Sequence, residues 1–153
     1  MLKKISKKII TFIFIVFVYS ACEKNEGITT DALSVQTGLF NSVVSHDGLS
    51  RQFIMYVPTN YNSDIEYPLM INFHGFGGTA SDFVETADMR SLAENENFII
   101  VYPQGTLLGG FPHWNSSAPS SDNKSSVDDL GFVEKMIENI SSTYSINEKR
   151  VYA

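Results

Sequence analysis

A glycine-rich segment, His74-Gly75-Phe76-Gly77-Gly78-Thr79, combines residue types that could do chemistry. It follows a short apolar run that is typical of a strand. Glycines at the carboxyl end of a strand let backbone N–H groups turn outward, and such a loop can bind an anion or a developing oxyanion. The segment lacks the lysine and spacing of a Walker A loop and the Gly-x-Gly-x-x-Gly spacing. A turn without a ligand remains the alternative interpretation.

A second candidate is the segment 103–125, which is long for a loop. Loops of this length in compact domains are usually functional or disordered. It contains the only tryptophan, Trp114, between His113 and Asn115. An aromatic side chain in this context either lines a ligand pocket or pins the loop to the core. The sequence leaves both interpretations open.

Two adjacent carboxylates, Asp128 and Asp129, form a third candidate. Paired carboxylates can do acid–base or metal chemistry. They fall in the first turn of the clearest helical pattern of the chain, where Ser126 and Asp129 match a capping box. We therefore expect them to cap this helix. No metal site is expected, because metal-ligand spacing is missing among the histidines, which are His46, His74 and His113.

The elements that must position these residues begin with a β-hairpin. Residues 38–46 and 51–57 have strand patterns. Between them His46-Asp47-Gly48 is a hairpin signal, because glycine readily adopts the positive φ of tight turns. A histidine in such a turn needs no functional explanation.

The remaining elements predict a parallel sheet. The runs 68–74 and 98–102 are almost continuously apolar, as in strands covered on both faces. Residues 81–95 between them have the features of one helix capped by Ser81. A further strand starts at Arg150. A helix over 127–144 is predicted from apolar residues at spacings of three and four: Val127, Leu130, Val133, Ile137, Ile140 and Tyr144. The predicted architecture is α/β, with a β-hairpin followed by parallel β-α-β-α-β.

Residues 1–21 have the pattern of a signal peptide, in which four lysines precede an apolar run and small residues follow. A membrane-spanning anchor is the alternative, but a spanning helix needs about 20 apolar residues and this run is shorter. Cys22, the only cysteine, follows Tyr-Ser-Ala and resembles the lipidated cysteine of a bacterial lipobox. Tyr19 departs from that motif, and ordinary cleavage with a free thiol is the alternative. A disulfide within the chain is excluded.

These features divide the chain into a signal peptide (1–21), a tether behind a lipid anchor (22–37) and one domain (38–153). We expect a membrane as partner through the lipid, and a cell-envelope or extracellular location. The chain has 11 basic and 17 acidic residues, and four of the lysines lie within 1–21. The remainder has 7 basic and 17 acidic residues, hence a formal charge of −10. Such a surface repels phosphate backbones, so nucleic acid is not an expected partner.

Six segments, taken in order, resemble the family of polyhydroxybutyrate depolymerase-like and feruloyl-esterase-like α/β hydrolases. The resemblance runs from about residue 38 to the end, in the family's order. The segments are 51–58, 68–78, 98–105, 114–115, 128–132 and 150–153.

The resemblance implies a serine esterase that hydrolyses carboxylic esters without a metal or organic cofactor. In this family the strand that begins Arg-Val-Tyr-Ala leads into Gly-x-Ser-x-Gly, the nucleophile elbow. The catalytic serine, aspartate and histidine are therefore expected after Ala153, and residues 38–153 are expected to be the N-terminal half of the fold. No catalytic residue is expected within the chain, which would make it inactive alone.

The first half of the site is implied to lie within the chain. The implied roles are an oxyanion hole formed by the backbone N–H groups of Phe76 and Gly77, a loop supported by His74, Gly75 and Gly78, and a substrate pocket containing Trp114. The ester substrate stays open between a hydroxyalkanoate polyester, a feruloyl or acetyl ester on plant polysaccharide, and a smaller ester. Two other functions on the same fold also stay open, a noncatalytic surface-binding lipoprotein and a serine peptidase.

Overall fold

The computed structural model describes residues 35–118, 120–121 and 123–153. The predicted signal peptide, the predicted lipidation site Cys22 and most of the tether lie outside these residues. Within the described part, none of the helices has both the length and the apolar character needed to span a membrane.

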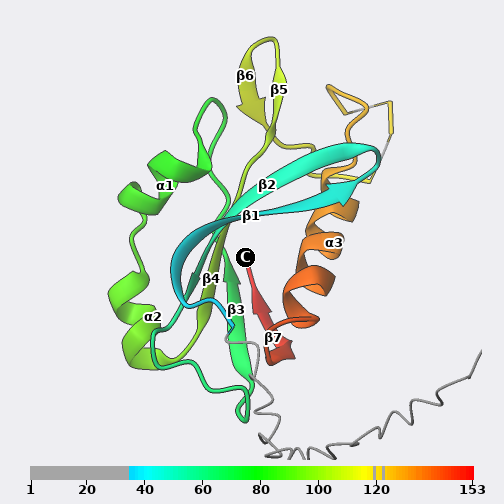
Figure 1. The fold of residues 1–153 in the computed structure, drawn as a ribbon. Helices are drawn as coiled ribbons and strands as arrows, with labels where there is room; N and C mark the ends of the chain where they lie inside the picture. Colours follow the sequence, from blue (N-terminus) through cyan, green and yellow to red (C-terminus); the bar gives the residue numbers. More distant parts are fainter. Residues whose placement is uncertain (1–34, 119, 122) are drawn as a thin grey trace, which may run out of the picture. The chain divides into compact units, whose positions relative to one another are not determined.

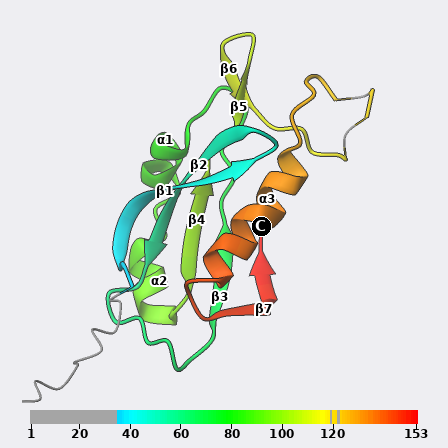
Figure 2. The ribbon, with the colours of Figure 1, turned by 45° about the vertical axis from the view of Figure 1, so that its right-hand side comes forward.

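Five strands form one sheet in the order β1-β2-β4-β3-β7 (Figures 1 and 2). Strands β1, β2 and β4 are antiparallel neighbours, whereas β3 is parallel to both β4 and β7. The predicted hairpin and parallel strands are confirmed. The bounds are β1 Gly38–His46, β2 Leu49–Val57, β3 Tyr67–Ile71, β4 Ile99–Pro103 and β7 Ile146–Tyr152. The β1–β2 turn uses positive φ at Asp47 and Gly48, as a tight hairpin turn requires.

Helices cover both faces of this sheet (Figure 1). One face carries α1 (Ala80–Thr86) and α2 (Arg90–Glu96), and the other carries α3 (Asp129–Ser141). Alternate residues of β4 divide between the two cores: Ile99 and Val101 pack with the residues of α3, and Ile100 and Tyr102 with those of α1 and α2. This double burial explains why the sequence of β4 is continuously apolar.

The prediction of a single helix over 81–95 is wrong, because the chain forms two short helices there. Thr79, and not Ser81, caps α1: its hydroxyl accepts the N–H of Asp82 at 3.1 Å. The buried Tyr102 hydroxyl donates to the carbonyl of Ala87 at 2.9 Å. Asp88 accepts the N–H of Arg90 at 3.0 Å. These bonds satisfy backbone groups at the junction of α1 and α2, where the helical hydrogen bonds are interrupted.

The expected capping box of the long helix is also wrong. Asp128 is the cap, since its carboxylate accepts the N–H of Gly131 at 3.0 Å. The predicted apolar stripe is confirmed in part. Ile140 and Tyr144 are buried, and Val133 and Ile137 pack against the core. Leu130 is 42% exposed, and the most buried line of the helix also includes Phe132 and Met136, which the prediction left out. Asp129 lies buried at the start of this line.

The segment after β4 is not one continuous loop. Strands β5 (Thr106–Leu108) and β6 (Phe111–His113) form a hairpin whose turn residues Gly109 and Gly110 both have positive φ. The segment that follows, residues 114–128, is named the long loop below. The hairpin and the long loop both lie at the carboxyl ends of β3 and β4 (Figure 1). Open α/β sheets bind their ligands at this end.

Candidate functional site

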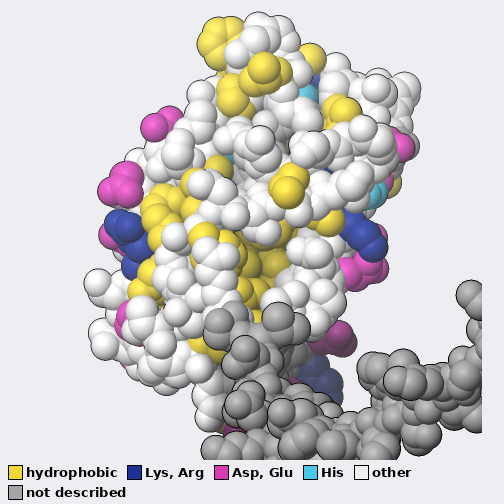
Figure 3. Space-filling view, in the orientation of Figure 1, with side chains coloured by type: hydrophobic (Ala, Val, Ile, Leu, Met, Phe, Trp, Pro, Cys, Tyr) yellow, Lys and Arg dark blue, Asp and Glu magenta, His cyan; other side chains and the backbone are white. Residues whose placement is uncertain are grey.

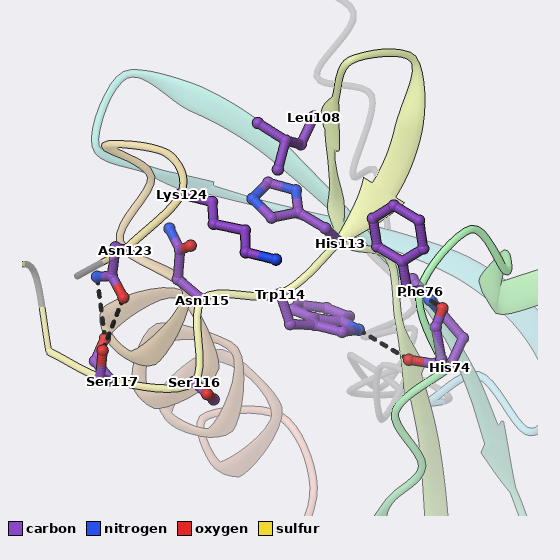
Figure 4. Close-up of a pocket in the computed structure, with 11 residues that line it drawn as sticks. His74, Phe76, Leu108, His113, Trp114, Asn115, Ser116, Ser117, Asn123 and Lys124 are labelled. Atoms are coloured by element: carbon purple, nitrogen blue, oxygen red, sulfur yellow. Dashed lines mark hydrogen bonds between the residues drawn. The ribbon is translucent and has the colours of Figure 1, made fainter.

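A cleft of about 460 Å³ opens at the carboxyl ends of β3 and β4 (Figure 4). Residues of the segment 74–79, named the glycine loop below, form one side together with Leu108. The other side belongs to the long loop. Its first residue, Trp114, and the preceding His113 lie between the glycine loop and the rest of the long loop. The structure thus brings four of the predicted site residues to one cleft: His74, Gly75, Phe76 and Trp114.

His74 is 3% exposed and connects the glycine loop to the segment after β4. Its Nδ1–H donates to the carbonyl of Gly75 at 2.8 Å, and its Nε2 accepts the N–H of Gly105 at 3.0 Å. A carbonyl can only accept, so Nδ1 carries the proton and the neutral ring has no free nitrogen. These contacts hold a loop in place and leave no nitrogen free to transfer a proton.

The two predicted oxyanion donors have different environments. The N–H of Gly77 donates to the carbonyl of Pro112 at 2.8 Å, with φ of 77° at Gly77. The N–H of Phe76 has no hydrogen-bond partner among the described residues. Gly78 closes the turn by donating to the carbonyl of Gly75 at 3.0 Å. Phe76 therefore offers the available N–H, and Gly77 could donate only after its bond to Pro112 breaks.

The side chain of Phe76 lies on the surface, 72% exposed, beside Phe111 of the β5–β6 hairpin, which is 57% exposed. Their ring centroids are 5.8 Å apart. Figure 3 shows hydrophobic side chains gathered at this end of the molecule. Sequence reasoning missed this aromatic pair because it did not predict the hairpin. The Gly-Gly dipeptide at 109–110, flanked by apolar residues, is the signal that could have revealed it.

Trp114 combines the two roles between which the sequence did not decide, packing against the core and lining a cleft. Its indole N–H donates to the carbonyl of His74 at 3.1 Å, and its ring contacts Phe73 with centroids 5.1 Å apart. It also stacks parallel to Phe132 of α3 at 6.4 Å. The indole is partly buried and borders the cleft. Trp114 thus pins the start of the long loop to the core and lines the cleft.

A buried ion pair lies under the base of the long loop. Arg51 and Asp129 are each 3% exposed, and the guanidinium meets the carboxylate at 2.6 Å. Asp129 also accepts the backbone N–H of Asn115 at 2.7 Å, and Arg51 lies 3.9 Å above the ring centre of Phe132. Sequence reasoning missed this pair. The signal was the position of Arg51, which lies two residues before the buried Phe53 and therefore on the same face of the strand.

His113 ties the two ends of the long loop together. It is 4% exposed, its Nδ1–H donates to the carbonyl of Thr106 at 2.9 Å, and its Nε2 lies 3.0 Å from the hydroxyl of Ser125. The side-chain amide of Asn115 donates to the same hydroxyl at 3.0 Å. Within the described ranges no carboxylate touches His113, so this serine–histidine pair is not a triad. No Ser-His-Asp triad and no metal-binding cluster occur in the described part of the chain.

His46, the last residue of β1, pairs with the residue that caps α3. Its Nε2 lies 3.1 Å from the carboxylate of Asp128. The pKa of Asp128 is lowered from its ordinary value, chiefly by the hydrogen bond from the Gly131 N–H and also by His46. The hairpin turn is thereby connected to the start of α3, a contact that the sequence did not predict.

The chain is similar to esterases of known function, although no family model matches it. It is 28% identical over 103 residues to feruloyl esterase B of Piromyces equi, and 30% identical over 103 residues to feruloyl esterase B of Talaromyces funiculosus. It is also 26% identical over 112 residues to the bifunctional acetylxylan esterase/xylanase XynS20E of Neocallimastix patriciarum. These alignments cover 67%, 67% and 73% of this chain but only 18%, 28% and 15% of the relatives. The chain therefore spans less than a third of the length of each.

Solved structures of an esterase and of another hydrolase share its fold. Acetyl xylan esterase from Aspergillus awamori superimposes with a TM-score of 0.57 at 20% identity, over 73% of this chain and 40% of that one. An S-formylglutathione hydrolase from Agrobacterium tumefaciens gives a TM-score of 0.54 at 16% identity, over 76% of this chain and 48% of that one. The described part of the chain has a partial α/β-hydrolase fold, as the sequence predicts.

Proposed function

We propose that this chain contributes the oxyanion side of the active site of a serine carboxylic-ester hydrolase. The observation that carries the proposal is the N–H of Phe76, which has no hydrogen-bond partner among the described residues and belongs to a residue that lines the cleft at the carboxyl end of β3. The loop that presents it is held by His74, whose two ring nitrogens are both occupied. The similarity to feruloyl and acetylxylan esterases supports the same reaction class.

In the proposed reaction a serine attacks the ester carbonyl, and water then hydrolyses the acyl-enzyme. The carbonyl oxygen becomes negatively charged in the tetrahedral intermediate. A fixed N–H stabilises that charge more than it stabilises the neutral carbonyl of the substrate, and this difference accelerates the reaction. The nucleophile, its histidine and its aspartate are expected after Ala153, beyond strand β7. No cofactor takes part in this proposal.

The proposed substrate is a feruloyl or acetyl ester on plant polysaccharide. The similar proteins are named feruloyl esterase and acetylxylan esterase, and these names support this choice over a polyester. We also propose that the protein is exported and lipidated at Cys22, since residues 1–21 have a signal pattern that ends in small residues before the only cysteine. Labelled palmitate should enter the wild-type protein and not the Cys22→Ala variant. Equal labelling of the two would contradict lipidation.

The test of the proposed activity uses the full-length gene product. It should hydrolyse methyl ferulate or acetylated xylan, and a fluorophosphonate probe should label one serine and abolish the activity. Cleavage of peptide substrates and not esters would support the serine peptidase. If the probe labels no serine and no ester is hydrolysed, the proposal is contradicted and the noncatalytic binding lipoprotein is supported.

A further inference from the structure

The β1–β2 hairpin leaves one of its two faces open. Gln52 lies opposite Val43 in the pair, and Asn41 lies two residues from Val43, so these three side chains share a face. All three residues are exposed, and Val43 is 55% exposed. Phe53, which follows Gln52, points to the other face and is buried with the residues of α3. The outer face of the hairpin is therefore accessible to a ligand.

Three adjacent cavities lie along this outer face. Their volumes are about 440, 130 and 410 Å³. Gln52 lines all three, Gln104 lines the first two, and Asn41 lines the last two. The start of α1 borders them through Ala80, and the β5–β6 hairpin borders them through Leu107. Cavities that share lining residues in this way form one elongated depression, which is named the sheet groove below.

The floor of the sheet groove presents hydrogen-bonding groups that the described residues do not use. The side chains of Asn41, Ser50 and Gln52 form no hydrogen bond with any other described residue. Apolar surface lies beside them, from Val43 in the floor and from Leu107, which is 68% exposed, in the wall. The sheet groove thus combines free amides and a free hydroxyl with small apolar patches.

This combination fits the chemistry of sugars. A side-chain amide has a carbonyl oxygen that accepts and an amino group that donates, and a sugar hydroxyl does both. One amide can therefore bind two neighbouring hydroxyls of a sugar ring. The C–H groups of the ring gain free energy when they cover apolar side chains such as Val43. Because the groove is elongated and carries such groups along its length, it suits a chain of sugar units better than one compact ligand.

The sheet groove lies next to the cleft that holds the Phe76 N–H. Thr79, the last residue of the glycine loop, lines the groove, whereas the first three residues of that loop line the cleft. Leu107 and Pro112 lie opposite each other in the β5–β6 hairpin and line the groove, and the adjacent Leu108 points to the other face and lines the cleft. The groove and the cleft are thus separated by one hairpin and share the glycine loop.

We propose that the sheet groove binds the backbone of an uncharged polysaccharide such as xylan, while an ester carried by the same chain occupies the cleft. The part about the ester rests on the proposed function. The residues of the groove act by binding and take no part in bond cleavage. The protein should therefore prefer an ester on a polysaccharide to a small ester with the same acyl group.

The binding test titrates the full-length gene product with xylohexaose in a calorimeter. Xylohexaose carries no ester, so its binding does not depend on catalysis. Gln52→Ala and Asn41→Ala should each raise the Kd about two- to tenfold, the range expected for the loss of one hydrogen bond. Asn139→Ala, which removes an exposed amide of α3 outside the groove, is the matched control and should leave the Kd unchanged. Absence of xylohexaose binding, or the same Kd in all three variants, would overturn the inference.

A kinetic arm separates the inference from the proposed function. In Gln52→Ala the kcat/KM for feruloylated arabinoxylan should fall, and the kcat/KM for methyl ferulate should stay unchanged. Hydrolysis of methyl ferulate without binding of xylohexaose would overturn the groove and leave the esterase proposal standing. Binding of xylohexaose that depends on Gln52, without hydrolysis of either ester, would overturn the esterase proposal and leave the groove standing.

Discussion

The glycine loop and the long loop border the same cleft but are held in different ways. The glycine loop is six residues long and is fixed by backbone bonds and by the buried ring of His74. The long loop is fixed at its base by the buried pair Arg51–Asp129 and by the contact of His113 with Ser125. Its middle part, which includes Lys124, is largely exposed.

This difference separates two tasks. Stabilising an oxyanion needs a donor held within a few tenths of an ångström, and bonds on both sides of Phe76 supply that constraint. Recognising variable ligand groups tolerates side chains that adjust. The long loop, with a fixed base and an exposed middle, matches this second task. The predictions below change one loop at a time, from the largest expected effect to the smallest.

The largest effect is expected from Arg51→Met. The variant leaves the carboxylate of Asp129 buried without its cation, and such a loss typically costs about 3–5 kcal/mol. The midpoint of urea unfolding, followed by circular dichroism and by Trp114 fluorescence, should fall accordingly. Arg90→Met removes an exposed pair with Asp88 and is the matched control. If both variants lowered the midpoint equally, the buried pair would not be what holds the long loop.

The second effect concerns the contact between the hairpin and the glycine loop. A Cβ at Gly105 would lie 2.4 Å from the carbonyl oxygen of His113 and 3.2 Å from the ring of His74. Gly105→Ala should therefore destabilise the protein by about 1–3 kcal/mol, as overpacking does. Gly75→Ala is the control, because its Cβ would meet nothing within 4 Å. Unchanged stability of Gly105→Ala would show that the hairpin can move away from His74.

A smaller effect is expected from Ser125→Ala, which removes the hydroxyl shared by His113 and Asn115. The loss should be about 1 kcal/mol, because both partners keep other hydrogen bonds. Amide hydrogen exchange should speed up in the long loop and stay unchanged in the glycine loop. Faster exchange in both loops would mean that the two are not held independently.

The smallest effect is a pH dependence at the start of α3. The pKa of Asp128 is lowered in the folded protein, so its contribution to stability is present above the unfolded-state pKa, about 4. That contribution is lost as the pH falls through the folded-state pKa. The wild type should therefore lose more stability than Asp128→Asn between pH 5 and pH 3. Identical losses of stability for the two proteins, measured by thermal unfolding, would show that the carboxylate of Asp128 does not titrate in this range.

The sequence predicted the elements whose patterns are local and missed the contacts that are distant in the chain. Strands β3 and β4 were found because burial on both faces leaves an almost continuous apolar run. Strand β7 begins at Ile146, four residues before the predicted start at Arg150, because its first half is mostly polar. The break between α1 and α2 was missed because Tyr102 stabilises it from β4, fifteen residues away. The burial of Asp129 was missed because its partner Arg51 is 78 residues away. In the site, the glycine loop was visible from its residue types, but the bond from Gly77 to Pro112 depends on a hairpin that was not predicted.

The central claim is that the N–H of Phe76 stabilises the oxyanion. The most direct measurement compares the kcat for ester hydrolysis of Phe76→Pro, which lacks this N–H, with that of Phe76→Ala, which keeps it, in the full-length gene product. With both variants folded by circular dichroism, kcat should fall about 10²- to 10³-fold in Phe76→Pro and much less in Phe76→Ala. Equal kcat values for the two variants would contradict the claim.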